Sequence, residues 1–377
     1  MRSFFDQEQI RLIKFWLPGF VTGGFVWLLL LFLVSTPIVR ASGLALVIVG
    51  MTSALRRMGT AVAVIGGLTL AFSPVFWSQA GGGQGQPATI VLALIAGMIT
   101  VALVIVISKR TYIGVGFGLV VFAVLFISQV GNPQSIRLTG LVIGWLMFLL
   151  VDMLLVTNPR PEDAPLLLLT GHPRNSDGSE SARPYHTYGI LLLLSVGVLN
   201  DPLLTLLVPS IILSITLTRT TLSPAYWLFL GLLIGVGILG VSTTYLQDQA
   251  PYMALASWQD AHRWINMVEL VVTQFTPIGV ILGVLGLSRL SRWYPPLGTV
   301  SLIAFAAYWS FGLIYLGNNR DLLLLPLFAI QVIWMSYAVL AISDWVSHLN
   351  PSLLRVGKYS VIVLYAVLPT LLFVKHL

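Results

Sequence analysis

The chain contains no cysteine, and only 9% of its 377 residues are charged. The missing cysteine excludes disulfide bonds, thiolate metal ligands and a cysteine nucleophile. The low charge excludes an ordinary soluble enzyme, because soluble domains carry about 25% charged residues. The basic excess, a net charge of +7, is too scattered to form a nucleic-acid-binding surface. These absences leave a membrane-embedded protein with no nucleic-acid partner.

Long apolar segments fill the sequence, which is 57% hydrophobic. A helix that crosses a bilayer needs about 20 mostly apolar residues. The sequence therefore predicts an all-α, polytopic helical bundle with about 11–13 transmembrane helices. The expected spans lie near residues 15–36, 40–55, 58–77, 88–108, 111–130, 138–157, 187–200, 202–218, 223–245, 273–288, 297–316, 323–343 and 359–374.

The first expected span follows Arg2, Arg11 and Lys14 without a small-residue cleavage site, so we interpret it as a retained helix rather than a signal peptide. The short segments 187–200 and 202–218 are equally compatible with one broken helix or a re-entrant hairpin.

The basic residues predict the orientation of the spans. With a cytoplasmic N-terminus, fifteen of the twenty Lys and Arg residues fall in cytoplasmic loops and five in outer loops. This bias follows the positive-inside rule and predicts a multi-pass protein of the cell membrane, in contact with membrane lipids. The candidate extracytoplasmic carboxylates are then Asp201, Asp248, Asp260, Glu269 and Asp321.

The polar segments divide the chain into two membrane halves. Residues 1–157 form an N-terminal half of about six spans. Residues 158–186, rich in Pro, Gly, Ser and mixed charge, predict a flexible cytoplasmic linker. Residues 187–377 form the C-terminal half, which contains a long extracytoplasmic loop at 246–272.

The loop 246–272 carries the most informative polar pattern. From Trp258 onward its spacing predicts a short helix at the membrane surface, with Ile265 and Val268 toward lipid or the bundle and a polar stripe that includes Arg263. This helix either caps the bundle or lines a substrate site, and both interpretations stay open.

Several residues near this face suit phosphate or proton chemistry. Asp248, Asp260, His262, Arg263 and Glu269 could supply a base, a proton shuttle and a phosphate clamp, although Asp260 and Arg263 also fit a structural i,i+3 pair.

Elsewhere the sequence leaves similar pairs of interpretations. Arg320 and Asp321 either anchor a lipid phosphate or end a helix. Asp201 either binds a metal or a phosphate or caps a helix. Asp152 fits a helix-end role, and His186 lies in the linker without carboxylates at metal-ligand spacing.

Five segments, in order along the chain, resemble bacterial membrane proteins of the C-type glycosyltransferase (GT-C) superfamily, related to protein O-mannosyltransferases. The run Leu-Ala-Phe-Ser-Pro-Val-Phe-Trp-Ser-Gln-Ala at 70–80 resembles the family's "sp-x-fW-x-qa" segment. The other segments are 197–209 (Gly-Val-Leu-Asn-Asp-Pro to Val-Pro), 258–260 (Trp-Gln-Asp), 274–287 (Gln-Phe-Thr-Pro-Ile-Gly to Gly-Leu) and 318–326 (Asn-Asn-Arg-Asp to Leu-Pro).

The resemblance implies a glycosyltransferase that takes a sugar from a polyprenyl phosphate at the extracytoplasmic face. It implies a carboxylate base, and cationic groups or a divalent cation that stabilise the departing phosphate. We expect Asp260 or Asp248 as the base, Arg263 and Arg320 at the phosphate and Trp258 beside the sugar. The other expected substrate-binding residues are His262, Glu269, Asp321 and Asp201.

The family's usual base is missing from this sequence. The family places its key Asp in a long first outer loop, whereas the corresponding segment here, near 35–42, is short and has no acidic residue. One alternative is therefore a non-catalytic GT-C-like scaffold or partner subunit of a larger complex. A transporter is the third alternative.

Overall fold

The computed structural model describes residues 7–80, 101, 114–120, 136–157, 184–218, 220, 222–245, 253–317, 319–349 and 354–376. Within these ranges every regular element is a helix, apart from one isolated bridge between Met253 and Tyr315. The all-α prediction is thus confirmed for the described residues. The expected spans 88–108 and 111–130 fall largely outside them, as do Asp248 and most of the linker.

The helices follow most of the predicted apolar segments. The α-helices are α1 (Gln7–Phe32), α2 (Ile38–Leu55), α3 (Thr60–Ala71), α4 (Pro74–Trp77), α7 (Ile136–Thr157), α9 (Pro184–Asn200), α10 (Val208–Leu217), α11 (Pro224–Tyr245), α12 (Ala261–Trp293), α13 (Pro295–Ile314), α14 (Arg320–Leu323), α15 (Leu325–Leu349) and α16 (Leu354–Val374). Short 3₁₀ helices are η1 (Arg56–Met58), η4 (Pro202–Leu207) and η5 (Leu255–Gln259).

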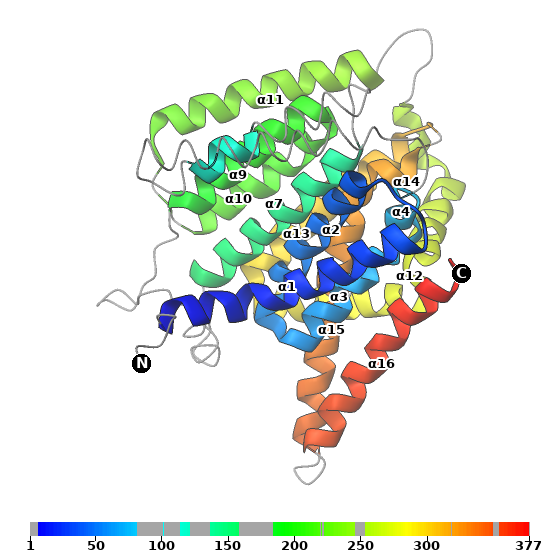
Figure 1. Cartoon of the computed structure of the whole chain (residues 1–377). Coiled ribbons are helices and arrows are strands. Elements are labelled where there is room, and N and C mark those ends of the chain that lie inside the picture. Colours follow the sequence, from blue (N-terminus) through cyan, green and yellow to red (C-terminus); the bar gives the residue numbers. More distant parts are fainter. Residues whose placement is uncertain are drawn as a thin grey trace.

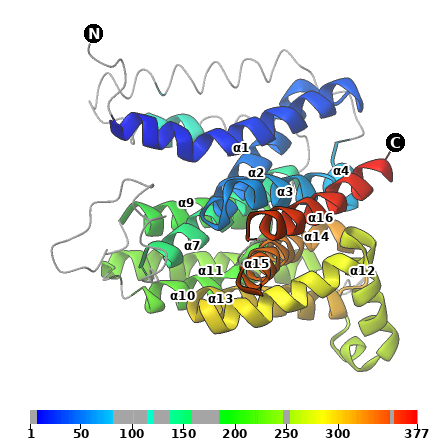
Figure 2. The ribbon, with the colours of Figure 1, turned by 90° about the horizontal axis from the view of Figure 1, so that it is seen from below.

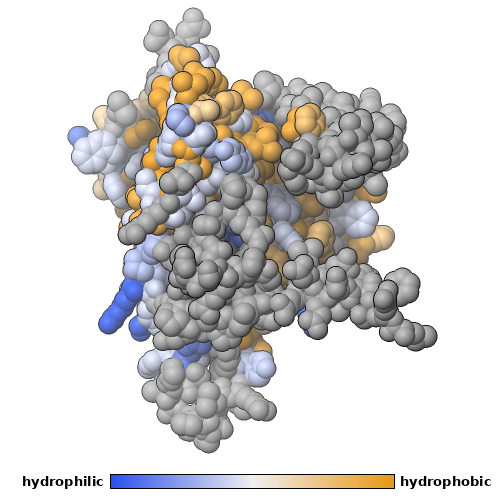
Figure 3. Space-filling view, turned by 90° about the vertical axis from the view of Figure 1, so that its left-hand side faces the viewer, coloured by the Kyte–Doolittle hydropathy of each residue, from blue (hydrophilic) through white to orange (hydrophobic). Residues whose placement is uncertain are grey.

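Five of the described helices, α1, α11, α12, α13 and α15, are long and apolar enough to cross a membrane. Shorter apolar helices supplement them, and large apolar side chains such as Leu228 and Leu239 of α11 are exposed. Orange, hydrophobic residues are also plain on the described part of the surface in Figure 3. An apolar exterior is what a lipid environment requires, so these features indicate an integral membrane protein.

The predicted span 58–77 is interrupted. Helix α3 ends at Ala71, and α4 starts at Pro74 after Ser73 adopts an extended backbone. A residue before proline is driven out of the helical region, and proline itself suits the first position of a new helix. The segment therefore turns a corner instead of continuing across the bundle.

Helix α12 is longer than the predicted span 273–288, because the expected surface helix and this span merge into 33 residues. At 1.5 Å per residue such a helix would measure about 50 Å, against a bilayer core of about 30 Å. It is broken at Thr276, which has φ 63° and ψ 167° and precedes Pro277. Figure 2 shows its yellow-green beginning turned steeply away from the yellow remainder.

The segment 187–218 contains two helices separated at Asp201. Helix α9 ends at Asn200, Asp201 has an extended backbone, and η4 leads into α10. Since η4 packs against both α9 and α11, the chain doubles back at this point rather than running on as one helix.

Helix α15 forms the centre of the bundle and contacts α3, α12, α13 and α16. Its closest neighbour is α12, where Gly283 faces the Gln331 side chain and Gly286 lies directly against the Trp334 backbone carbonyl. Small residues let membrane helices approach this closely. The second half of α12 is therefore packed tightly on α15, and the start of α12 extends from this packed part.

One end of the bundle gathers segments that lie far apart in the sequence. Helices α4 and α14, the broken helix α12 and the C-terminus lie toward this end in Figures 1 and 2. The His376 ring stacks on Trp77 of α4 with ring centroids 5.2 Å apart. The connection between α1 and α2, residues 33–37, has no acidic residue, as the sequence predicts.

Candidate functional site

The site begins where η5 and the start of α12 dock on the end of α13. The Ala254 backbone N–H donates to the Ile314 carbonyl at 2.9 Å, and the Ser257 hydroxyl donates to the Leu313 carbonyl at 3.0 Å. The Met253–Tyr315 bridge extends this contact. These bonds hold the start of α12 against the chain that leads into α14.

Two arginines meet at this junction, and we call the group of Trp258, Arg263, Tyr315 and Arg320 the arginine end. Arg263 donates through Nη1 to the Tyr315 carbonyl at 3.3 Å, and both guanidinium-bearing residues are partly buried. Burial lowers the pKa of Arg320 below its ordinary value, the positive charge of Arg263 lowers it further, and Asp321 opposes the shift. Arg320 begins α14 five residues after Tyr315, whose carbonyl binds Arg263, so both arginines belong to this junction.

No ion pair within 4.0 Å joins Arg263 or Arg320 to a carboxylate among the residues that the structure describes. Two neighbouring, partly buried cations without paired carboxylates attract an anion. Guanidinium groups match phosphate in particular, because their planar N–H groups bind two phosphate oxygens at once. The arginine end can thus bind a phosphate group.

Trp258 lies in η5, five residues before Arg263 in the sequence, and 55% of its surface is exposed. Its backbone carbonyl accepts a hydrogen bond of 2.7 Å from the Trp264 indole N–H. This bond joins η5 to the first turn of α12, the turn that carries Arg263. The exposed Trp258 ring is available for contact with a sugar or a lipid.

The predicted acidic and imidazole groups have varied surroundings. Asp260 caps α12, since its Oδ1 accepts from the His262 backbone N–H at 2.9 Å, and its side chain is exposed. His262 and Glu269 are exposed on α12, and Asp321 is partly buried beside Arg320. The structure therefore brings Asp260, Arg263, Arg320 and Asp321 to one end of the bundle.

Asp201 is buried, with 6% of its surface exposed. Its Oδ1 accepts from the Leu203 backbone N–H at 3.0 Å and so caps η4. Its Oδ2 accepts a long hydrogen bond of 3.5 Å from Thr139 of α7. These contacts match the helix-cap interpretation of Asp201.

Two segments that carry the family resemblance touch each other. The Gln274 side chain of α12 accepts a 2.8 Å hydrogen bond from the Val75 backbone N–H of α4. Gln79 in turn donates to the Val75 carbonyl at 3.1 Å. Gln274 lies two residues before the break in α12, so this bond ties α4 to the hinge of the helix that carries Arg263.

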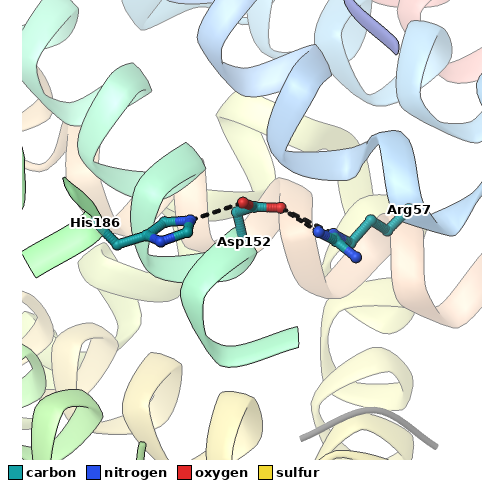
Figure 4. A network of polar contacts seen from close by, with 3 residues as sticks. All are labelled: Arg57, Asp152 and His186. Carbon is teal, nitrogen blue, oxygen red and sulfur yellow. Dashed lines mark hydrogen bonds and ion pairs between the residues drawn. The ribbon is translucent and has the colours of Figure 1, made fainter. Parts of the chain in front are cut away.

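A polar network between η1, α7 and α9 was not predicted from the sequence. Asp152 of α7 accepts from Arg57 Nε and Nη2 at 2.9 and 2.6 Å, and its other oxygen lies 2.8 Å from His186 Nε2 (Figure 4). The sequence predicts Asp152 as a helix-end residue and places His186 in the linker. In the structure α9 begins at Pro184, so His186 is a buried helix residue.

The position of these three residues in the predicted topology carried a signal. Arg57, Asp152 and His186 each lie at the cytoplasmic end of a predicted span. Three polar groups at one depth must find partners when their helices pack together. The network joins η1, α7 and α9. Unlike Arg263 and Arg320, its arginine is paired with a carboxylate among the described residues.

The divalent cation that the resemblance implies does not fit the described residues. No group of three or more His, Asp or Glu side chains among them could hold a metal ion. The end of the bundle that holds Asp260 and Asp321 also holds Arg263 and Arg320, whose positive charges oppose the binding of a cation. Comparisons with protein-family models, curated proteins and solved structures found no match for this chain.

Proposed function

We propose that the protein binds the phosphate of a polyprenyl-phosphate-linked sugar at the arginine end and transfers the sugar there, as the glycosyltransferases that its sequence resembles do. The observation that supports this proposal is the pair Arg263 and Arg320, brought together from α12 and α14 without a paired carboxylate among the described residues.

Phosphate is the leaving group in such a transfer, and negative charge builds on it as the sugar departs. Fixed cations aimed at developing charge lower the barrier more than flexible ones, because they need no reorganisation during the reaction. Arg263 is held by the Tyr315 carbonyl, and the turn before it is held by the Trp258–Trp264 bond. The arginine end therefore suits a phosphate that accumulates charge.

The proposed reaction takes place at the outer face of the cell membrane. This orientation follows from the excess of basic residues in the predicted cytoplasmic loops. A polyprenyl chain is apolar, so its phosphate lies at the membrane surface, where we expect the ends of the bundle helices. Trp258 would then contact the sugar.

The transfer also needs a carboxylate that removes a proton from the acceptor. Asp260 remains our proposed base, because it is exposed at the start of α12 and lies three residues before Arg263. Its Oδ1 is engaged in capping the helix, which leaves Oδ2 for the acceptor. Asp248 is the second choice from the sequence.

The experiment is a transfer assay with purified protein in vesicles that contain a polyprenyl-phosphate sugar and an added hydroxyl compound as the acceptor, and it follows the release of polyprenyl phosphate. We expect Arg263→Ala and Arg320→Ala to lose most of the transfer rate, while Arg289→Ala retains it. Arg289 is an exposed arginine of the same helix that packs over Trp293. Equal rates in all three variants would contradict the proposal.

The second candidate is a non-catalytic subunit that binds the same lipid. Two observations favour it: the five-residue connection 33–37 has no acidic residue, and Asp260 is engaged as a helix cap. This candidate predicts that the wild-type protein binds polyprenyl phosphate but transfers no sugar without a partner. Co-purification of a stoichiometric partner, with activity restored by adding it, would favour the second candidate over the first.

A further inference from the structure

The first half of α12, residues 261–275, has an exposed apolar surface that the proposed function does not use. We call this part the outer half of α12. Its side chains Trp264, Ile265 and Val268 are exposed by 44%, 61% and 47%. Other helices, such as α11, expose apolar side chains as well, and such surfaces need a partner or a lipid environment.

The outer half has three sectors that follow the helical repeat of 100° per residue. Met267, Val271 and Gln274 form a buried sector against the bundle. The exposed apolar residues lie on one side of that sector. An exposed polar sector completes the circumference and consists of His262, Asn266, Glu269 and Thr273.

Three sectors distinguish this helix from an ordinary solvent-exposed helix. A helix at the edge of a soluble bundle needs only a buried face and a polar face. A third, exposed apolar sector between them is expected where one side of the helix rests on lipid and the other side meets water. The outer half therefore has the pattern of a helix that lies at a membrane interface while packing sideways on the bundle.

The second half of α12, past the break, also exposes apolar side chains. There Ile278, Ile281 and Val284 are exposed by 58%, 59% and 65%. This second half, from Pro277 to Trp293, has the length of a membrane span and packs on α15. The lipid that covers its exposed side can therefore extend over the outer half without a gap.

The break at Thr276 makes this arrangement possible. A straight α12 of about 50 Å would project beyond a bilayer core of about 30 Å. The left-handed backbone of Thr276 and the following Pro277 redirect the helix at this point, and Gln274 ties the bend to α4. The bend thus separates a part that spans the bilayer from a part that does not.

We propose that the outer half of α12 lies in the plane of the membrane, with Trp264, Ile265 and Val268 inserted into the lipid of the outer leaflet and with His262, Asn266 and Glu269 facing water. The partner of this surface is the lipid bilayer itself. Arg263, between the polar and the buried sectors, is then held at the level of the lipid phosphates.

The experiment uses the absence of cysteine in the chain. Single-cysteine variants Ile265→Cys, Val268→Cys, Asn266→Cys and Glu269→Cys receive a nitroxide spin label, and the full-length protein is placed in vesicles of phosphatidylcholine and phosphatidylglycerol. All four positions are exposed, so the label does not disturb the packing. Collision with oxygen, which concentrates in lipid, is compared with collision with a water-soluble nickel complex.

The labels at 265 and 268 should collide mainly with oxygen, and the labels at 266 and 269 mainly with nickel. If all four labels collide mainly with nickel, the outer half extends into water and the proposal fails. If 265 and 268 are shielded from both reagents, a protein covers them and the proposal also fails. No ligand is present, so the result is independent of phosphate binding and sugar transfer.

Discussion

The Arg57 guanidinium holds the Asp152 carboxylate through two hydrogen bonds of 2.9 and 2.6 Å, although the residues lie 95 positions apart in the sequence. Both side chains are nearly buried, and His186 binds the second carboxylate oxygen (Figure 4). The network therefore joins η1, α7 and α9 at a depth where each group alone would be costly.

Removing one member of this network should destabilise the protein strongly. We expect Arg57→Ala to lower the free energy of unfolding by about 3–5 kcal/mol, because it leaves the Asp152 charge buried without its cation. The double variant Arg57→Met with Asp152→Leu should lose much less, since it removes both charges. Thermal unfolding in detergent checks this order, and a double variant less stable than Arg57→Ala would contradict it.

The contact between α12 and α15 should be sensitive to a single methyl group. In Gly286→Ala the added Cβ would collide with the Trp334 backbone carbonyl, which cannot move without shifting α15. We expect a loss of about 1–3 kcal/mol or more of stability, as for overpacked cores. Gly231→Ala in α11 is the matched control, because nothing lies within 4 Å of its Cβ. Similar melting temperatures for the two variants would argue against the tight α12–α15 packing.

The break in α12 should tolerate glycine better than the regular helix does. A β-branched residue at φ 63° and ψ 167° costs about 1–3 kcal/mol, because this region suits glycine almost exclusively. Thr276→Gly removes that strain and should maintain or raise the melting temperature. Thr273→Gly, three residues earlier in regular helix, should lower stability by about 1 kcal/mol. The reverse order would mean that Thr276 is not strained.

The helices could be predicted from the sequence because the membrane imposes a simple requirement. A segment in lipid must be apolar and must pair its own backbone groups, so composition alone locates most of them. The break at Thr276 was not predicted, although a residue before proline avoids the helical region. The sequence did not show that the surface helix and the following span form one bent helix, because that depends on packing against α15 and α4.

The candidate site was predicted in part. The sequence selected Arg263 and Arg320, which lie at one end of the bundle, because basic residues are rare in the predicted outer loops. It left two interpretations of Asp201 open, since Asn-Asp-Pro is the same signal for a cap and for a binding turn, and in the structure Asp201 is a buried cap. His186 was placed in the linker because the start of α9 is polar, and its partners come from helices distant in the sequence.

The binding of polyprenyl phosphate, compared with uncharged polyprenol of the same length, tests phosphate recognition by Arg263 and Arg320 most directly. Affinities are measured by titration of the purified protein in lipid nanodiscs. The phosphate should bind at least about tenfold more tightly, since one charge-assisted hydrogen bond contributes about 1.5–3 kcal/mol. This preference should disappear in the double variant Arg263→Ala with Arg320→Ala and persist in Arg289→Ala. Equal binding of the two lipids by the wild type, or an unchanged preference in the double variant, would contradict the account.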